Sequence, residues 1–313
     1  MKAPRFWTQR GLAAQALRPF SLVTRIATAQ RVRKGGIALG IKTICVGNAG
    51  VGGAGKTMVV LDILRRLKPN PYALTRGYGG CQPGPLLVDR GQHEAADVGD
   101  EAMLLAAVAS TVVSHDRAAG ARLALAEGAS AIVMDDGLQN PSVRKTLSLL
   151  VIDGGYGFGN GLLLPAGPLR EPVMSAASRC QAAVLIGADE TGALAQLPAS
   201  LPVYRAELQP LCAESLARRP VIAFAGIGRP EKFFRSVLAL GAELVDTHSY
   251  PDHHVYSARD ITSLLGQTSS TGAKLVTTAK DYVKLPPSLR AACLVVQARL
   301  AWEDEAAWEN LLK

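Results

Sequence analysis

The chain has 313 residues, of which 48% are hydrophobic and 19% charged, a composition that excludes disordered and collagen-like proteins. Its uninterrupted apolar runs fall short of the ~18 residues expected of a bilayer-spanning helix, so we expect no membrane-spanning segment. The net charge of +8 is concentrated at the amino end, where ten basic residues precede the first acid, Asp62. This distribution argues against a nucleic-acid partner and favours one basic segment that meets an anionic surface.

Residues 1–30 are predicted to form an amphipathic helix that is broken or kinked at Pro19. Apolar residues recur there at three- and four-residue spacing, and arginines recur every seven or eight residues. The apolar positions are Leu12, Ala16, Phe20, Val23 and Ala27, and the basic positions are Arg10, Arg18 and Arg25. This pattern favours a helix that lies on an anionic membrane surface. A transit peptide and a helix packed on its own domain are the alternatives.

A strand, a glycine-rich turn and a helix are expected from residue 41 onward. Residues 41–46 are a short β-rich run, and residues 58–67 have the apolar spacing of a helix that Pro69 ends. The turn between them matches G-x-x-x-x-G-K-[ST], with Gly50, Val51, Gly52, Gly53, Ala54, Gly55, Lys56 and Thr57. In this motif backbone N–H groups surround phosphate oxygens, the lysine reaches the β- and γ-phosphates, and the hydroxyl binds Mg²⁺. The sequence therefore predicts a phosphate-binding P-loop.

Further buried strands alternate with helical stretches along the rest of the chain. The strands are expected at residues 131–134, 147–152, 182–186, 221–225, 275–277 and 293–296, and helices at 99–109 and 118–127. This alternation predicts an α/β fold, a P-loop NTPase-type parallel sheet flanked by helices, with a second, smaller α/β domain. Prolines and glycines near 190–220 place the boundary there, which gives a first domain over 31–210, preceded by the helix of 1–30, and a second over 211–313.

Three carboxylates lie where the chemistry of phosphoryl transfer would need them. Asp135 and Asp136 end the apolar run that starts at Ala131, as expected of the Walker-B element that supports Mg²⁺ beside a P-loop. Either of them is a candidate metal ligand. Asp100 opens a helical run, where a carboxylate either stabilises the helix N-terminus or acts as a general base on an acceptor hydroxyl.

Two loops defined by glycine or proline present basic side chains. Residues 75–80 carry Arg76 and Tyr78 in a glycine-rich turn, and residues 164–172 carry Arg170 between prolines. The planar guanidinium suits phosphate recognition, although both arginines are also compatible with an ordinary surface position. Loops of this kind favour the functional interpretation.

A histidine pair follows Asp252 in the second half of the chain. His253 is expected to form an acid–base pair with either Asp252 or Asp100, because imidazole titrates near neutral pH. A metal site at His253 and His254 is a weaker alternative, since no second His/Cys cluster supports it.

Taken in chain order, these motifs resemble the tetraacyldisaccharide 4′-kinase family. The matching segments are 47–57, 75–78, 99–101, 135–137 with Gln139, 163–172, 251–253, and 277–278 with 280–281. The resemblance implies two α/β domains that close over a cleft, and ATP- and Mg²⁺-dependent transfer of phosphate to the 4′-hydroxyl of a tetraacylated glucosamine disaccharide 1-phosphate, the lipid A precursor. It also implies work at the cytoplasmic face of the inner membrane of Gram-negative bacteria, and no obligate protein partner.

The resemblance further assigns roles to individual residues. It implies that Asp100 is the base, that His253 is its partner, and that Lys56 contacts phosphate. The implied metal ligands are Thr57, Asp136, Glu101 and Asp135, and the implied substrate-positioning residues are Asn48, Arg76, Tyr78, Gln139 and Arg170. The family usually reads Asp-Asp-Gly-Phe-Gln-His, whereas this chain has Leu138 and Asn140, and asparagine cannot carry the charge of a histidine.

Two other functions compete with a lipid kinase. A regulatory GTPase would usually carry N-K-x-D, and no lysine of this chain lies within such a tetrad. A soluble small-molecule kinase would share the P-loop but would not need the apolar and basic stripes of residues 1–30.

Overall fold

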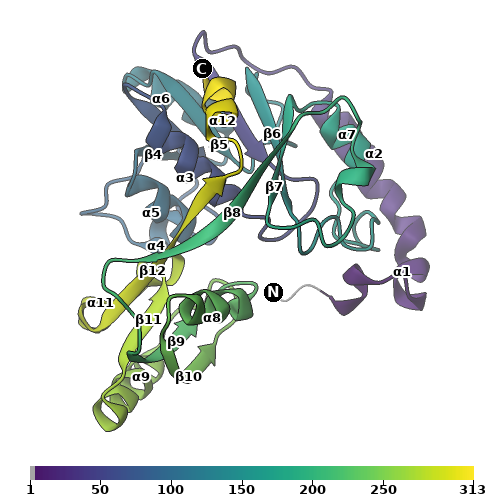
Figure 1. Ribbon diagram of the computed structural model, residues 1–313. Coiled ribbons are helices and arrows are strands. Elements are labelled where there is room, and N and C mark those ends of the chain that lie inside the picture. The colour runs from purple at the N-terminus through teal and green to yellow at the C-terminus, as the bar shows by residue number, and fades with distance from the viewer. Residues whose placement is uncertain (1–3) are drawn as a thin grey trace.

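In the computed structural model, which describes residues 4–313, twelve strands form one continuous sheet. The strand order is β10-β9-β11-β12-β8-β7-β6-β1-β5-β2-β4-β3 (Figure 1). The strands are β1 (Lys42–Gly47), β2 (Pro71–Thr75), β3 (Leu86–Leu87), β4 (Ser110–Val113), β5 (Ala131–Asp135), β6 (Leu147–Asp153), β7 (Ala182–Ile186), β8 (Val203–Cys212), β9 (Pro220–Ala225), β10 (Glu243–Ser249), β11 (Lys274–Thr278) and β12 (Cys293–Trp302).

The first body of the molecule is a sheet that helices cover on both faces and that is parallel except for the edge strand β3. Its central strands β7, β6, β1, β5 and β2 are almost wholly buried apolar runs, as expected of parallel strands. Helices α3 (Lys56–Arg66), α5 (Asp100–Ala106) and α12 (Glu305–Leu312) bury their apolar sides in the core on one face. Helices α6 (Arg117–Ala126) and α7 (Val173–Ala177) pack into the core on the other face.

The second body, residues 213–292, is smaller and has its own two cores. Helix α8 (Pro230–Ala239) packs on one face of β9, β10 and β11. Helices α9 (Ala258–Thr271) and α11 (Pro287–Ala292) pack on the other face. The short helix α10 (Ala279–Tyr282) follows β11 directly and faces the first body.

Two long strands, β8 and β12, join the bodies and fix their orientation (Figure 1). Strand β8 is parallel to β7, β12 is antiparallel to β8, and β11 is parallel to β12. The parallel strands of the two bodies therefore run in opposite directions, and their carboxyl ends face one another. Ligands of α/β proteins bind at such carboxyl ends, so this is where a site is expected.

The chain returns to the first body after β12. The rings of Trp302 and Trp308 stack at 3.8 Å, and the Trp308 indole donates to Asp62 of α3 at 2.8 Å. The last helix thus belongs to the core of the P-loop body, although it lies beyond residue 210. The division of the chain at that residue stays a prediction.

The amino end forms several short helices in place of one continuous helix. They are η1 (Arg5–Thr8), α1 (Leu12–Leu17), η2 (Arg18–Phe20) and α2 (Ser21–Val32), and the break predicted at Pro19 lies in η2. The part of the predicted helix before residue 4 lies outside the described residues. Within residues 4–313, no helix combines the length and apolar character needed to cross a bilayer.

The predicted strands are present, but the sequence analysis did not identify β2, β3, β4, β8 and β10. Strand β2 begins with a proline, and β4 has only four residues. Strand β10 lies at the sheet edge with mostly exposed, polar residues, and β8 is also largely exposed. Hydrophobic patterning is weak in such segments because neighbouring strands, and not an apolar face, hold them in the sheet.

Candidate active site

The P-loop lies between β1 and α3 at the carboxyl edge of the first body. Gly52 has a φ of 112° and Gly55 a φ of 83°, a region that residues with a Cβ rarely adopt. A Cβ on Gly55 would also lie 2.6 Å from the side chain of Ile186. The glycines are therefore required by the path of the loop, which ends as Lys56 begins the helix.

The Lys56 side chain extends toward Asn48 and Asp136, the residue directly after β5. Its Nζ lies 3.2 Å from Asn48 Oδ1 and 3.6 Å from Asp136 Oδ1. Burial opposes ionisation of Asp136, but the charges of Lys56 and Arg170 outweigh it and hold the pKa of Asp136 below its ordinary value. The Lys56 ammonium is thus held at the P-loop by the amide oxygen of Asn48 and the ionised carboxylate of Asp136.

The residues that would hold Mg²⁺ are Thr57 and Asp135, with Glu101 nearby. Thr57 Oγ1 lies 3.3 Å from Asp135 Oδ2, while Asp135 Oδ1 is buried without a hydrogen-bond partner. Burial and the negative charge of Glu101 raise the pKa of Asp135 to about 7. A buried carboxylate with an unpartnered oxygen beside a hydroxyl is a donor set that suits Mg²⁺. The structure thereby places Asp135, and not Asp136, beside Thr57.

Arg170 and Gln139 connect the loop of residues 164–172 to the P-loop. Arg170 Nη1 lies 2.9 Å from Asp136 Oδ2 and 3.3 Å from Gln139 Oε1. The Gln139 amide donates to Asn48 O at 2.9 Å and to Glu171 Oε1 at 2.8 Å. These contacts hold the Arg170 guanidinium at the edge of the P-loop, on its β5 side.

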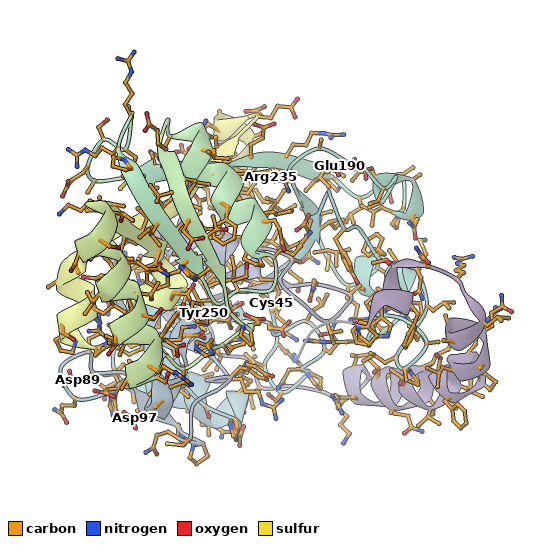
Figure 2. The ribbon with its side chains drawn as sticks, turned by 90° about the horizontal axis from the view of Figure 1, so that it is seen from below. Cys45, Asp89, Asp97, Glu190, Arg235 and Tyr250 are labelled. Atoms are coloured by element: carbon orange, nitrogen blue, oxygen red, sulfur yellow. The ribbon has the colours of Figure 1, made fainter. Side chains whose placement is uncertain are left out.

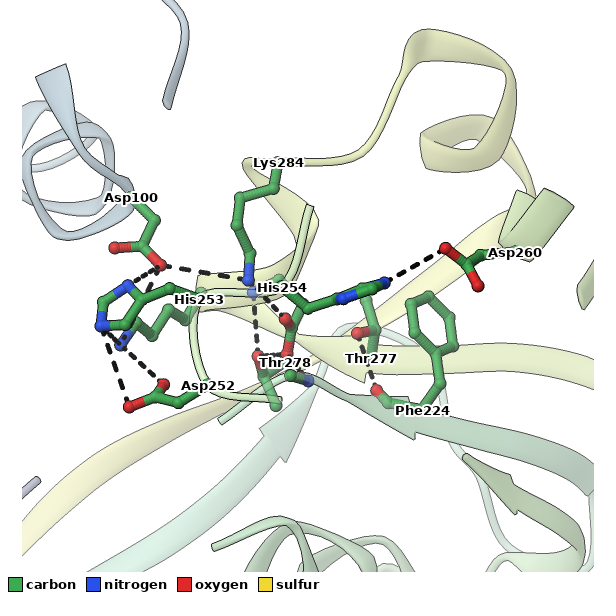
Figure 3. Close-up of polar contacts among 12 residues, drawn as sticks. Asp100, Phe224, Asp252, His253, His254, Asp260, Thr277, Thr278 and Lys284 are labelled. Atoms are coloured by element: carbon green, nitrogen blue, oxygen red, sulfur yellow. Dashed lines mark hydrogen bonds and ion pairs between the residues drawn. The ribbon is translucent and has the colours of Figure 1, made fainter. Parts of the chain in front are cut away.

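Asp100 and His253 come from different bodies and meet where the two bodies contact each other (Figure 3). Asp100 is buried at the start of α5, and its Oδ2 lies 3.0 Å from His253 Nδ1. Asp252 is farther from the imidazole, at 3.8 Å from Nε2. Of the two partners expected for His253, the structure therefore favours Asp100. His254 turns the other way and contacts Asp260 at 3.1 Å.

Two lysines that the sequence analysis assigned to no role complete this cluster. Lys280 Nζ lies 3.4 Å from His253 Nε2, 3.5 Å from Asp252 Oδ1 and 3.7 Å from Glu101 Oε1. Lys284 Nζ lies 4.0 Å from Asp100 Oδ2. The sequence did contain a signal for Lys280, because Lys280 and Asp281 come just after a buried strand whose carboxyl end faces the site.

The lysines and the histidine decide the charge of Asp100. Burial raises its pKa, but the hydrogen bond of His253 and the charges of Lys280 and Lys284 outweigh burial, so the pKa of Asp100 is lowered. An ionised Asp100 accepts the hydrogen bond, which makes His253 Nδ1 the donor. Burial opposes the charge of Lys280, but the carboxylates of Asp100, Glu101 and Asp252 raise its pKa.

The glycine-rich turn after β2 places Tyr78 at the rim of the cleft. The Tyr78 and His253 rings lie 5.1 Å apart, and the phenol side chain is 65% exposed. Arg76 is exposed at the end of β2. Asn140, where the family usually has histidine, accepts hydrogen bonds from the Ser142 amide and hydroxyl at 2.9 and 2.7 Å. Its side chain thus closes a local turn.

This arrangement is suited to transferring phosphate to an alcohol. The first body carries a phosphate-binding loop with a lysine and a magnesium-compatible carboxylate. It also carries an ionised carboxylate, Asp100, which a histidine of the second body holds. Phosphoryl transfer requires this combination of positioning and charge neutralisation.

Comparisons with known proteins identify the family. The model of the family described as "Tetraacyldisaccharide-1-P 4'-kinase" matches residues 13–313. The tetraacyldisaccharide 4′-kinase of Gluconacetobacter diazotrophicus is 54% identical over all of this chain and 97% of its own length, and that of Rhodospirillum rubrum is 48% identical over the same shares.

A solved structure is similar over almost the whole fold. It is described as the crystal structure of the "apo" form of LpxK from Aquifex aeolicus in complex with ATP. It superposes with a TM-score of 0.80 at 28% identity, covering 96% of this chain and 98% of the other. The predicted α/β fold is therefore confirmed, and the chain belongs to the tetraacyldisaccharide-1-P 4′-kinase family.

Proposed function

We propose that this chain transfers the γ-phosphate of ATP to the 4′-hydroxyl of a tetraacylated glucosamine disaccharide 1-phosphate. The observation that carries the proposal is the Asp100–His253 pair, in which a histidine of the second body holds a carboxylate of the body that carries the P-loop. The names of the relatives supply the acceptor, and the complex of the Aquifex aeolicus protein with ATP supplies the nucleotide.

The residues of the chain then have separable tasks in the reaction. Bound Mg²⁺ would neutralise phosphate charge, and Thr57 and Asp135 are the residues that would hold it, with Asp136 and Glu101 nearby. Lys56 and the P-loop amides bind the phosphate tail, and Arg170 neutralises charge on the transferring group. Asp100 accepts the proton of the sugar hydroxyl as the hydroxyl oxygen bonds to the γ-phosphorus. The bond from that phosphorus to the β–γ bridging oxygen of ATP breaks, and ADP leaves. His253 holds the Asp100 carboxylate in place.

Incubation with ATP, Mg²⁺ and a tetraacylated disaccharide monophosphate tests this function. Mass analysis of the lipid should show the addition of one phosphate with the wild type and almost none with Asp100→Asn. A chain that phosphorylates a soluble sugar but never the acylated acceptor would instead be a small-molecule kinase. Tight GTP binding without ATP turnover would support the GTPase alternative.

We also propose that the N-terminal helices rest on the cytoplasmic face of the inner membrane. Helix α2 contacts the body with its polar side, because Ser21 and Thr24 donate to the Leu163 and Leu164 carbonyls, each at 2.8 Å. Its apolar side faces outward, with Val23 69% exposed, and Phe20 of the preceding η2 is 62% exposed. A water-facing helix has the reverse arrangement, so this face suits a lipid surface.

The same contacts relate the membrane to the reaction site. Leu163 and Leu164 begin the loop that carries Arg170, so the helix that would meet the lipid is attached to a loop of the active site. In Figure 2 the purple N-terminal helices lie at one side of the molecule, away from the second body. An acceptor whose acyl chains stay in the membrane would then present its sugar to the cleft.

Vesicle co-sedimentation tests the membrane proposal. Val23→Asp and Phe20→Ser should each reduce binding to anionic vesicles about tenfold, since a fully buried side chain of this size contributes ~1.5–3 kcal/mol. Leu238→Ser, at an apolar residue exposed on α8, is the matched control and should leave binding unchanged. Equal binding by all variants would contradict the proposal.

A further inference from the structure

The carboxylate of Asp281 has no role in the reaction described above, yet a single lysine side chain separates it from Asp100. Asp281 is 0% exposed, and its Oδ1 lies 2.8 Å from Nζ of Lys284, which is also buried. The same Nζ lies 4.0 Å from Asp100 Oδ2 (Figure 3). A buried ion pair adds little net stability, because the cost of removing both charges from water offsets their attraction. The geometry that this pair imposes on its surroundings is therefore its more informative property.

The other carboxylate oxygen of Asp281 fixes the backbone that presents His253. Oδ2 accepts the Gly226 N–H at 3.0 Å, and the Gly226 carbonyl accepts the His253 N–H at 3.2 Å. A Cβ on Gly226 would lie 3.0 Å from Asp281 Oδ1 and 3.2 Å from the Pro251 carbonyl oxygen, so the carboxylate packs directly against this turn. His253 itself has a φ of 59°, a left-handed conformation that a residue with a Cβ keeps only where its surroundings enforce it. The hydrogen bond from Gly226 to Asp281 is part of that enforcement.

The same oxygen also fixes the helix that carries Lys280. Thr278 is the N-cap of α10, and its hydroxyl donates to Asp281 Oδ2 at 2.7 Å and accepts the Asp281 N–H at 3.0 Å. Lys280 lies between these two residues, and its Nζ is 3.4 Å from His253 Nε2. Asp281 thus joins the turn of His253 to the helix of Lys280.

We infer that Asp281 is a positioning residue for phosphoryl transfer. It orients His253 through Gly226, and it orients Lys284 through the ion pair. Both partners then act on Asp100, the base. Because Asp281 is fully buried, it would contact no substrate, and its loss should lower turnover without weakening the binding of ATP or acceptor. This inference rests on the proposed function, because it deepens the assignment of Asp100 as the base.

Single-turnover transfer and ATP titration of Asp281→Asn test this role. Asparagine keeps an oxygen that can accept the Gly226 N–H, but it cannot form an ion pair with Lys284. Turnover should fall about tenfold, less than the ~10²–10⁴-fold of a lost general base, because the base itself remains. The Kd for Mg·ATP and the KM for the acceptor should be unchanged. Asp260→Asn, at a carboxylate in the first turn of α9 that contacts His254 at 3.1 Å, is the matched control and should keep wild-type turnover.

The same substitution in the Asp100→Asn background separates positioning from a structural role. If Asp281 acts only through partners of Asp100, its replacement should change the residual rate less than about twofold once residue 100 is neutral. A merely structural residue would lower the residual rate by the same factor in both backgrounds. Thr278→Val, which lacks the hydroxyl, provides the same cycle where Asp281→Asn does not fold; it should lower turnover about threefold, and Thr278→Ser should restore it.

Three results would overturn the inference. They are wild-type turnover in both Asp281→Asn and Thr278→Val, a loss of the same factor with and without the Asp100 carboxylate, and a loss confined to the Kd for ATP or the KM for the acceptor. The first result, obtained with a wild type that transfers phosphate, would leave the proposed function standing. A wild type that transfers no phosphate to the acylated acceptor would refute both.

Discussion

The P-loop and the Asp100–His253 pair face the same cleft but are built in different ways. The P-loop is eight consecutive residues, and the side chains of Lys56 and Thr57 have partners in the first body, namely Asn48, Asp135 and Asp136. The Asp100–His253 contact joins residues 153 positions apart, one in each body. A phosphate site of this kind can persist when the bodies separate, whereas the paired base exists only when they dock.

The pKa values of Asp135 and Asp100, the buried carboxylates of these two regions, are shifted in opposite directions. Burial and neighbouring acids raise the pKa of Asp135, whereas the hydrogen bond of His253 and the charges of Lys280 and Lys284 lower the pKa of Asp100 despite its burial. At Asp135 the charge of Lys56 does not outweigh burial and the neighbouring acids, whereas the partners of Asp100 do outweigh its burial. The first suits a metal ligand and the second suits a base held ready for an acceptor.

Asp100→Asn should give the largest effect and separates the two regions most sharply. Loss of a general base costs about 10²–10⁴-fold in turnover, while the P-loop is untouched, so the Kd for ATP should not change. Single-turnover transfer and ATP titration measure the two quantities. Asp252→Asn removes the more distant carboxylate beside His253 and should cost far less; equal losses would contradict the assignment of the base to Asp100.

Lys56→Met should lower both binding and turnover. Its ammonium is held at the opening of the P-loop, and loss of one charged donor to a transferring group costs about 10²-fold or more. Titration should also show weaker ATP binding, unlike the result for Asp100→Asn. Lys68→Met, at an exposed residue just after α3, is the control. Normal ATP affinity in Lys56→Met would contradict the assignment of ATP binding to the P-loop and of proton transfer to the Asp100–His253 pair.

Lys280→Met should reduce turnover about tenfold without changing the Kd for ATP. Its cation lies among Asp100, Glu101 and Asp252, and without it these carboxylates repel where the bodies dock. Lys280→Arg should restore most of the turnover. Lys274→Met, at the exposed start of β11, should behave as the wild type. A loss of ATP affinity in Lys280→Met would place this lysine in the nucleotide site.

The smallest expected effect is a pH dependence of the free energy of unfolding of the metal-free protein. Because the pKa of Asp135 is raised to about 7, the folded state keeps a proton that the unfolded chain releases near pH 4. The free energy of unfolding should therefore fall by about 1 kcal/mol between pH 6 and pH 8 in EDTA. Chemical denaturation measures this slope, and Asp135→Asn should remove that part of it. An unchanged slope would mean that Asp135 is ionised throughout the range.

Much of the first body could be predicted because its signals are local. The P-loop motif, the apolar run ending at Asp135 and the helix after Thr57 each follow from neighbouring residues. Strand β10 could not be predicted in this way, since its exposed polar residues are held only by pairing with β9. The choice between Asp100 and Asp252 as partner of His253 likewise needed the docking of two bodies.

The sequence by itself determined the phosphate-binding loop, seven of the strands of the α/β fold and the amphipathic character of the amino end, because local spacing encodes each of them. Tertiary structure alone decided that Asp135 lies beside Thr57 and that Lys280 and Lys284 enter the base cluster. These contacts join residues far apart in the chain. They depend on how β8 and β12 orient the two bodies, and no local pattern records that orientation.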